Sequence, residues 1–207
     1  AIGGGLWWFL RDDAPDEVSL DAAVDQVTDD TTPDTSEAAA SAIEGTWTVD
    51  TETGAFDFES ATGTFAGFRV QEELAAIGSA TAVGRTGDVT GSFAIEGTTV
   101  TQAEFDVDLT TITTNESRRD DRVQEALETG AFPTATFTLT EPLDLGAGAA
   151  DGEAVSVIAV GDLTIHGVTR PAVLAVTVNQ IGTHPMANDP AAGFDATTTI
   201  KRTDFGI

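Results

Sequence analysis

The sequence predicts an all-β protein, an antiparallel β-barrel with one main helix, preceded by a membrane-helix stub and an acidic linker. Three observations support this fold class. From Thr46 onward, short runs alternate apolar and polar residues with the period of two that is typical of strands with one buried face. Glycines and other turn residues separate these runs, as in successive hairpins. Only one interior segment clearly shows the apolar spacing of a helix.

Residues 1–11 have the composition of the last turns of a membrane helix or anchor. The first ten residues carry no charge, and Trp7 and Trp8 precede Arg11, which resembles an aromatic belt at a membrane surface. A helix needs about 20 residues to cross a bilayer, so ten cannot span it alone. The segment also lacks an initiator methionine, and we expect it to be the end of a longer anchor. The alternative is the end of a signal peptide.

Residues 12–44 are predicted to form a flexible acidic linker. They contain eleven acidic residues and no basic residue, a composition that buries too little apolar surface to offset chain entropy. A short helix is expected over residues 19–27, with Ser19 as its N-cap. Its apolar side is so short that it would need a surface to pack on.

Residues 45–207 are predicted to form the barrel domain. So many strands in about 160 residues must curl into a barrel or stack as a sandwich, because a long open sheet would expose its edges. Glycines 84, 91 and 161 fall on expected strands, where they leave room inside the wall or bend it. The nine stretches that suit strands are residues 46–50, 54–60, 64–70, 88–97, 99–112, 135–143, 153–167, 168–180 and 194–202.

The main helix is expected over about residues 116–129. Asn115 or Ser117 can cap its N-terminus, and Gly130 favours its end. A second, single-turn helix is expected over residues 71–78, QEELAAIG.

The composition excludes several classes of function. The chain carries 35 acidic and 9 basic residues, a formal net charge of −26 at pH 7, which repels nucleic acids and anionic lipid surfaces at long range. The absence of cysteine excludes a zinc site built on sulfur. We interpret the acidic residues as a solvated surface, with a docking face for a basic partner or a store of cations as the alternative.

The two histidines do not predict an enzyme. His166 and His184 lie 18 residues apart, and neither has a second histidine at a helical or hairpin spacing, so no metal site is expected. No G-x-S-x-G elbow is present to support a hydrolase triad. We therefore expect no catalytic residues. His166 is interpreted as a turn residue of the hairpin 161–174, with one ring nitrogen bonded to backbone; contact with a ligand or partner at a polar rim is the alternative.

Two groups of charged residues are candidate sites. Asp106 and Asp108 alternate with apolar residues, which places them on the outer face of a strand as solvated charges. Lys201 and Arg202 concentrate positive charge near the end of the sequence. Arg202 is the second residue expected at the polar rim, as a contact for an anionic group.

Five motifs in the same order resemble the YceI-like family, and the resemblance covers residues 45–207. It implies a lipocalin-like antiparallel barrel that binds polyisoprenoid lipids, including isoprenoid quinones, in a long apolar pocket of a usually exported protein. Family members continue for a further strand, so a C-terminal strand is expected to be missing here, which leaves an open edge. The stub and linker resemble those of membrane-anchored actinobacterial members. The motifs are WTVD at 47–50, GSFAIEG at 91–97, residues 107–143, GDLTIHGVTRP at 161–171 and TTIKRTDFGI at 198–207.

Strand parity then selects the residues expected to line the pocket. A barrel of about eight strands can fill its interior or hold one elongated ligand. Each buried CH2 group of such a ligand contributes about 0.8 kcal/mol, so a hydrocarbon tail can bind without any catalytic residue. The expected wall residues are Phe56, Phe58, Phe65, Phe93, Phe105, Val107, Leu109, Phe137, Leu139, Val157, Leu163 and Ile165.

The leading hypothesis is a lipid-binding protein of the cell membrane, held by a single-pass anchor with its domain on the extracytoplasmic side. Its ligand would be a polyisoprenoid lipid or a menaquinone-type quinone, and it requires no cofactor. The alternative is an accessory subunit of a membrane complex, such as a respiratory complex, that docks through the linker or the open barrel edge.

Overall fold

The computed structural model describes residues 15, 43–52, 54–74, 78–150, 153–183 and 190–207. The predicted membrane stub and the short helix over 19–27 lie outside the described residues. Within the described ranges, none of the helices has the length and apolar character needed to cross a bilayer.

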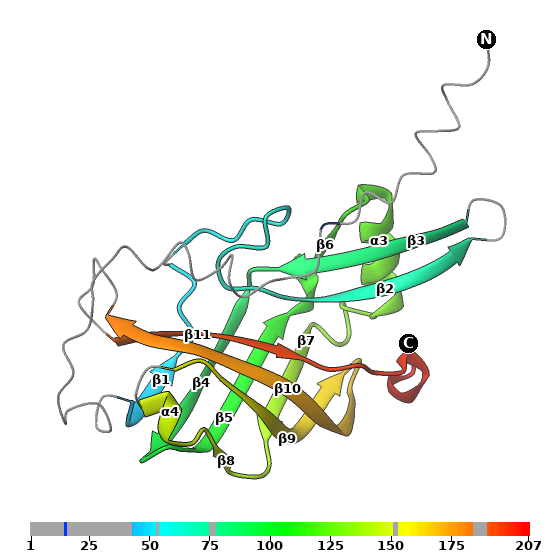
Figure 1. Cartoon of the computed structure of the whole chain (residues 1–207). Helices are drawn as coiled ribbons and strands as arrows, with labels where there is room; N and C mark the ends of the chain where they lie inside the picture. The colour runs from blue at the N-terminus through cyan, green and yellow to red at the C-terminus, as the bar shows by residue number, and fades with distance from the viewer. Residues whose placement is uncertain (1–14, 16–42, 53, 75–77, 151–152, 184–189) are drawn as a thin grey trace.

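Two antiparallel sheets form the described fold (Figure 1). The larger sheet runs β1-β4-β5-β7-β9-β10-β11, with β8 paired to β5, and the smaller runs β2-β3-β6. The strands are β1 Gly45–Thr48, β2 Ala66–Leu74, β3 Gly78–Thr86, β4 Val89–Glu96, β5 Thr99–Asp108, β6 Thr113–Thr114, β7 Thr134–Leu139, β8 Leu143–Asp144, β9 Val155–Ile165, β10 Val168–Thr183 and β11 Pro190–Thr197; the helices are η1 Leu109–Thr111, α3 Ser117–Ala126, α4 Ala147–Ala150 and η2 Arg202–Phe205.

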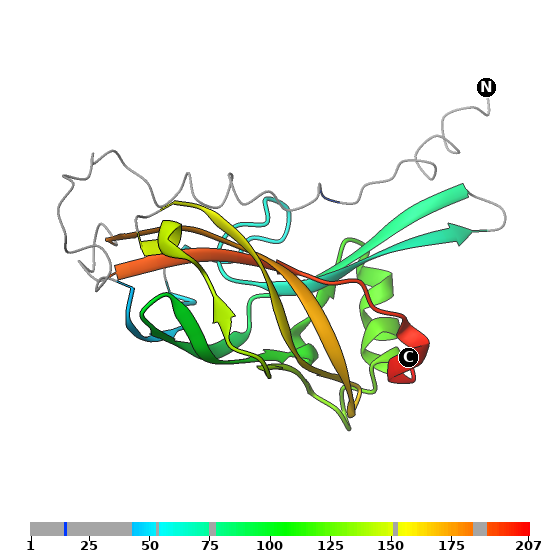
Figure 2. The same cartoon turned by 60° about the horizontal axis from the view of Figure 1, so that its bottom comes forward.

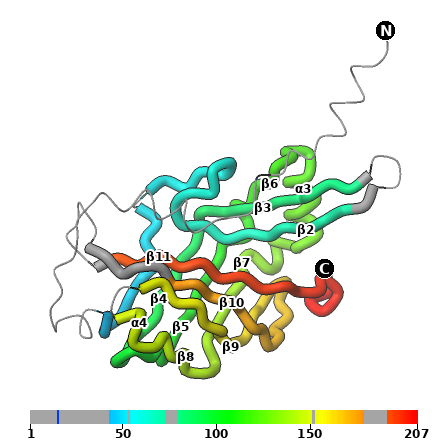
Figure 3. The backbone as a smooth tube through the Cα atoms, in the orientation of Figure 1, coloured from blue at the N-terminus to red at the C-terminus, as the bar shows by residue number. Residues whose placement is uncertain are grey.

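The larger sheet curls into a half-barrel, which confirms the predicted all-β antiparallel class. Figures 2 and 3 show β10 and β11, in orange and red, crossing over the green strands β4 and β5 of the same sheet. The rings of Phe194 on β11 and Phe93 on β4 lie 6.1 Å apart, although their strands are at opposite ends of the sheet order. The curl therefore brings distant strands face to face.

The smaller sheet corrects two predictions. Residues 71–74 continue β2 and pair with β3 rather than forming the expected helix over 71–78. β3 is not among the predicted strand stretches, although Gly84 was expected to lie on a strand, because the small side chains of Ala80, Ala82 and Gly84 give almost no apolar contrast. Pairing with β2 on one side and β6 on the other nevertheless makes β3 the central strand of this sheet.

The stretch 54–60 is a turn and not a strand, contrary to the prediction. Its ladder is limited to a single bridge between Asp57 and Thr62. The Asp57 carboxylate accepts hydrogen bonds from the hydroxyl and the backbone N–H of Ser60, at 2.6 and 2.7 Å. These bonds lower the pKa of Asp57, the hydroxyl bond most, and they hold the chain in a side-chain-stabilised turn.

Helix α3 forms where it was expected, but neither predicted residue caps it. The N-cap is Glu116, whose side chain makes no capping bond. The Asn115 side chain instead bonds to β3: its Oδ1 accepts from the Val83 N–H at 3.0 Å, and its Nδ2 donates to the Thr81 carbonyl at 3.1 Å. Asn115 thus extends the pairing of β3 beyond the two residues of β6.

The three glycines predicted on strands each make room for a phenylalanine ring. A Cβ at Gly161 would lie 2.4 Å from the Phe137 ring and 2.4 Å from the Thr138 carbonyl oxygen. A Cβ at Gly84 would likewise collide with the Phe68 ring, and a Cβ at Gly91 with the Phe105 ring. Part of the space left by these glycines is therefore filled by the protein's own side chains.

Candidate functional site

The concave face of the half-barrel is lined by side chains that alternate inward along each strand. One continuous row of paired residues crosses five strands: Gly91, Phe105, Phe137, Leu163 and Arg170. Phe137 is buried in this row, whereas Phe105 and Leu163 are half-buried and Arg170 is exposed. The apolar surface of this face thus ends at a basic residue near the β9–β10 turn.

Three phenylalanine rings meet on this concave face. The Phe194 ring lies 5.5 Å from that of Phe105 and 6.1 Å from that of Phe93, and the Phe93 ring stacks on Trp47 at 6.0 Å. Phe194 remains 40% exposed in spite of these contacts. A large ring that faces the concave side and keeps this exposure offers apolar surface to a ligand.

One end of the concave face is closed by the main hydrophobic core. Ile43, Ile95, Val100, Leu145 and Ala149 are buried there. Side chains packed against this cluster include Phe93, Leu139 and Val157, three of the predicted wall residues. Any elongated apolar ligand would therefore extend from this closed end toward the other end of the strands.

The predicted wall residues are not all in one place. Val107, Leu163 and Ile165 lie on strands with their partly buried side chains at the inward positions. Leu109 was predicted to face inward from a strand, which is wrong. β5 ends at Asp108, and Leu109 is the buried first residue of η1. Phe56 and Phe58 lie in the turn that replaces the expected strand 54–60.

A second aromatic group surrounds the buried side chain of Arg85 on β3. Its guanidinium carbon lies 5.3 Å from the Phe58 ring centre and 5.4 Å from that of Phe65, and its Nη1 donates to the Phe58 carbonyl. Arg85 is 3% exposed, and burial, followed by the nearby Arg69, lowers its pKa. Phe65 also packs against Phe56 at 5.8 Å. Two predicted wall residues, Phe58 and Phe65, therefore contact a buried cation and a third, Phe56, packs against Phe65, which the sequence did not reveal.

His166 occupies the turn between β9 and β10, as predicted. It adopts a left-handed φ of 54°, followed by Gly167 at 69°. Its Nδ1 lies 3.1 Å from the Phe205 carbonyl oxygen, which can only accept, so Nδ1 carries the proton. The ring also contacts Phe132 edge-on at 4.9 Å, and Nε2 lies 3.6 Å from the Glu128 carboxylate. The predicted backbone bond is confirmed, and none of these neighbours is a hydroxyl or thiol nucleophile.

Arg202, the other predicted rim residue, begins η2 and is exposed. Arg170, which no sequence pattern indicated as a rim residue, lies nearer the concave face because it pairs with Leu163. Its Nε donates to the Asp204 carbonyl in η2 at 3.1 Å. The structure thus joins η2 to the β9–β10 hairpin through both Arg170 and His166.

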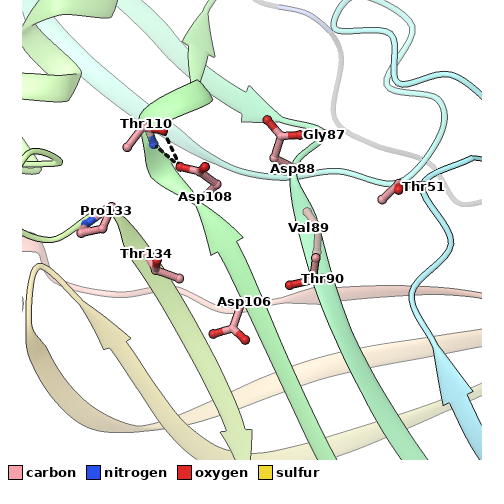
Figure 4. Close-up of a pocket in the computed structure, with 10 residues that line it drawn as sticks. All are labelled: Thr51, Gly87, Asp88, Val89, Thr90, Asp106, Asp108, Thr110, Pro133 and Thr134. Carbon is pink, nitrogen blue, oxygen red and sulfur yellow. Dashed lines mark hydrogen bonds between the residues drawn. The ribbon is translucent and has the colours of Figure 1, made fainter.

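A hollow of about 660 Å³ lies on the outer side of β4, β5 and β7 (Figure 4). Asp88, Asp106 and Asp108 line it together with threonines, so it is acidic and polar. The Thr110 hydroxyl and N–H donate to Asp108 at 2.6 and 2.8 Å and lower its pKa, the hydroxyl most. Across the described ranges, no three His, Asp or Glu side chains are grouped so that they could hold a metal ion.

A match to a protein-family model shows which family the chain belongs to. The family model described as "YceI-like domain" matches residues 47–207. The chain belongs to the YceI-like family.

Relatives of this YceI-like domain carry the name UPF0312 protein. One from Pseudomonas fluorescens is 33% identical over 141 residues, covering 66% of this chain and 70% of the relative. One from Shewanella baltica is 34% identical over 139 residues, with 63% and 66% covered, and one from Pseudomonas putida is 35% identical over 124 residues, with 58% and 60% covered. The chain therefore spans less than two thirds of the length of the last two.

Among the solved structures similar to this chain, one supports the fold. A mutant of a Campylobacter jejuni YceI protein, crystallised with a monobromobimane guest, aligns with a TM-score of 0.50 and 20% identity over 59% of this chain and 69% of that chain. A structure described as a polyisoprenoid-binding domain from Saccharophagus degradans aligns with a TM-score of 0.38 and 20% identity over 56% and 69%. At this identity, the first comparison shows that the YceI-like domain has the family's fold.

Proposed function

We propose that this YceI-like domain binds an isoprenoid lipid, with the hydrocarbon chain lying along the concave face. The observation that carries the proposal is the exposed ring of Phe194, 40% accessible while it faces Phe93 and Phe105. Exposed large apolar side chains gathered on a concave face are typical of ligand sites. The ligand class comes from the resemblance to the family.

The energetics favour a long hydrocarbon chain. Each buried CH2 group contributes about 0.8 kcal/mol, and association costs several kcal/mol or more in lost freedom. A chain of about ten such groups is therefore long enough to give net binding without a charged anchor. Because the hydrophobic core closes one end of the concave face, the hydrocarbon tail should point toward that end. The polar end of the lipid would then lie at the other end of the strands, near His166, Arg170 or Arg202.

We further propose that the ligand can be a menaquinone-type quinone, and that the domain is held at the cell membrane on its extracytoplasmic side. The composition of residues 1–11, with Trp7 and Trp8 before Arg11, supports the anchor. Fractionation of cells that produce the full-length protein, followed by protease treatment of intact cells, tests this. Recovery in the soluble cytoplasmic fraction would contradict it.

The lipid proposal is tested by retention of a defined probe. The purified chain is incubated with menaquinone or a polyprenol, passed through a desalting column, and the retained lipid is quantified by mass spectrometry. Phe194→Asp places a carboxylate beside the rings of Phe93 and Phe105 and should reduce retention at least tenfold, because a charge that the bound lipid buries without a partner is costly.

The matched control places the same charge on the opposite side of the sheet. Ile158→Asp replaces an exposed residue at an outward position of β9 and should leave lipid retention unchanged. Equal retention by Phe194→Asp and the unmodified chain, or no retention by either, would overturn the proposal. Circular dichroism confirms that both variants fold.

A second role, docking to a membrane complex, is favoured by the outer edge of β11. Among the described strands, β11 pairs only with β10, so one of its edges remains open to another strand. Mild-detergent extraction and co-purification of a partner would support this role; a chain recovered without partners would contradict it.

A further inference from the structure

One residue from the first part of the predicted acidic linker, Pro15, contacts the folded domain. Its carbonyl oxygen accepts a hydrogen bond from Nη1 of Arg69 on β2, at 2.7 Å, across 54 positions of sequence. Pro15 is itself buried. The bond therefore places this point of the linker against the β2–β3 sheet.

Arg69 shares one face of this sheet with Val83 and Arg85, and we call these three residues the arginine face. The register pairs Arg69 with Val83 and Gly67 with Arg85, and residues that pair directly point to the same side of a sheet. Arg69 is exposed, whereas Val83 and Arg85 are 2% and 3% exposed. The arginine face therefore combines one accessible guanidinium with a buried apolar side chain and a buried guanidinium.

The two guanidinium groups of the arginine face repel each other. Burial lowers the pKa of Arg85 most, the charge of Arg69 lowers it further, and Glu59 raises it by less than Arg69 lowers it. The Arg85 guanidinium also contacts the rings of Phe58 and Phe65, which are neutral groups. Added negative charge beside Arg69 would offset this repulsion and stabilise the face.

The sequence around Pro15 supplies such negative charge. Four of the six residues from 12 to 17 are acidic, namely Asp12, Asp13, Asp16 and Glu17. Proline fixes its own φ and restricts the residue before it to extended conformations, so this segment loses less conformational entropy when it is held on a surface. In charge and in stiffness, residues 12–17 therefore suit the arginine face.

We propose that residues 12–17 dock on the arginine face. The bond from Arg69 to the Pro15 carbonyl holds the segment in place, and attraction between the acidic side chains and the two arginines strengthens the contact. The rest of the acidic linker then forms a closed loop between the β2–β3 sheet and β1, instead of a free connection to the N-terminal segment.

Docking shortens the connection between the domain and the membrane anchor proposed over residues 1–11, and this consequence rests on that proposal. An extended chain spans about 3.4 Å per residue, so the stretch from Arg11 to Pro15 reaches about 14 Å. The stretch from Arg11 to Gly45, where β1 begins, would reach about 115 Å. A docked linker therefore holds the β2–β3 sheet close to the bilayer.

Paramagnetic relaxation in the full chain tests the docking without any membrane or lipid. The chain contains no cysteine, so Ala14→Cys provides a single site for a nitroxide label beside Pro15. We expect the label to reduce the amide NMR signals of residues 67–71 to about half or less. Arg69→Gln should restore most of the lost signal, because it removes the charge and shortens the donor. Arg118→Gln removes the same charge from an exposed position of α3 and should restore none.

A matched pair of linker variants tests the role of the carboxylates. Conversion of the four acidic residues of 12–17 to their amides should restore most of the signal of residues 67–71. The control variant changes the same residue types further along the linker and should restore none: Asp29→Asn, Asp30→Asn, Asp34→Asn and Glu37→Gln.

Undiminished signals of residues 67–71 in the labelled chain would overturn the docking proposal. An equal loss of signal with Arg69→Gln, or equal effects of the two linker variants, would also overturn it. Because no lipid or membrane is present, failure of the docking is distinguishable from failure of the proposed anchor or of lipid binding.

Discussion

The imidazole of His166 is joined to the backbone of Phe205: its Nδ1 lies 3.1 Å from the carbonyl oxygen. This bond connects the β9–β10 turn to η2, across 39 positions of sequence. Phe205 is buried beside it, and Arg170 adds a second bond from the same hairpin to η2. His166 therefore links the β9–β10 turn to η2 through this hydrogen bond.

Replacing His166 should weaken the link between the β9–β10 turn and η2. His166→Asn retains a residue that tolerates the left-handed φ of 54° but is too short to reach Phe205. We expect a loss of about 1 kcal/mol in the free energy of unfolding, the typical contribution of one hydrogen bond, measured by urea denaturation. Thr169→Ser in the same hairpin is the control. An unchanged midpoint for His166→Asn would show that the bond contributes nothing.

Gly161→Ala should destabilise the domain by about 1–3 kcal/mol, because the new Cβ overpacks a filled site. It would lie 2.4 Å from both the Phe137 ring and the Thr138 carbonyl, and the carbonyl belongs to a paired strand and cannot move aside easily. Gly130→Ala is the matched control, since its Cβ would meet no atom within 4 Å. Equal melting temperatures for the two variants would contradict this account of the wall.

Arg85→Lys should cost about 1–3 kcal/mol of stability. A lysine ammonium is more strongly hydrated than a guanidinium and lacks the planar group that lies over Phe58 and Phe65. Arg118→Lys on the exposed side of α3 is the control and should change stability by less than about 0.5 kcal/mol. Thermal unfolding by calorimetry compares the two, and similar losses in both variants would refute a special role for Arg85.

Carboxylate titrations should occur in a defined order. Burial raises the pKa of Asp195, whereas hydrogen bonds from Thr110 lower the pKa of Asp108. As the pH falls, Asp195 should protonate above the ordinary pKa of an aspartate and Asp108 below it. Carbon-detected NMR titration measures both midpoints, and the reverse order would contradict the assignments.

Asp108 and Asp195 should affect the pH dependence of the free energy of unfolding in opposite directions. Asp108, with its lowered pKa, contributes stability above the unfolded-state pKa that is lost as the pH falls through its folded value. Asp195, with its raised pKa, opposes folding when charged, and this penalty disappears at low pH. Asp195→Asn should therefore be more stable than the unmodified chain at neutral pH, with a smaller difference in acid.

Much of the fold could be predicted from local pattern. The alternation in β4 and β5 is strong because Phe and Val face one side and Ser, Thr, Asp and Glu the other. The hairpin at His166 was predictable from the turn residues of GDLTIHGVTRP. β3 is missing from the predicted strand stretches because its small residues give no such contrast. It is buried by segments distant in the sequence that pack against it in the folded domain.

The site could be predicted only in part. Parity placed Phe93 and Phe105 on the concave face, but it could not show that Phe194 from β11 would reach them, because that contact depends on the curl of the whole sheet. Phe56, Phe58 and Phe65 follow an alternating pattern, yet the Asp57–Ser60 bonds favour a turn. The contacts of Phe58 and Phe65 with Arg85 join residues that are far apart in the sequence, and no local pattern encodes them.

The pairing of β10 determines where the domain can open. β10 is bonded to β9 over eleven positions and to β11 along its other edge, so its amide hydrogens should be among the last to exchange with solvent. β1 and β11 lie at the ends of the sheet order and should exchange earlier. Fraying of these outer strands would uncover the three phenylalanine rings while the β9–β10 hairpin stays intact, which provides a route for a hydrocarbon chain to enter without global unfolding.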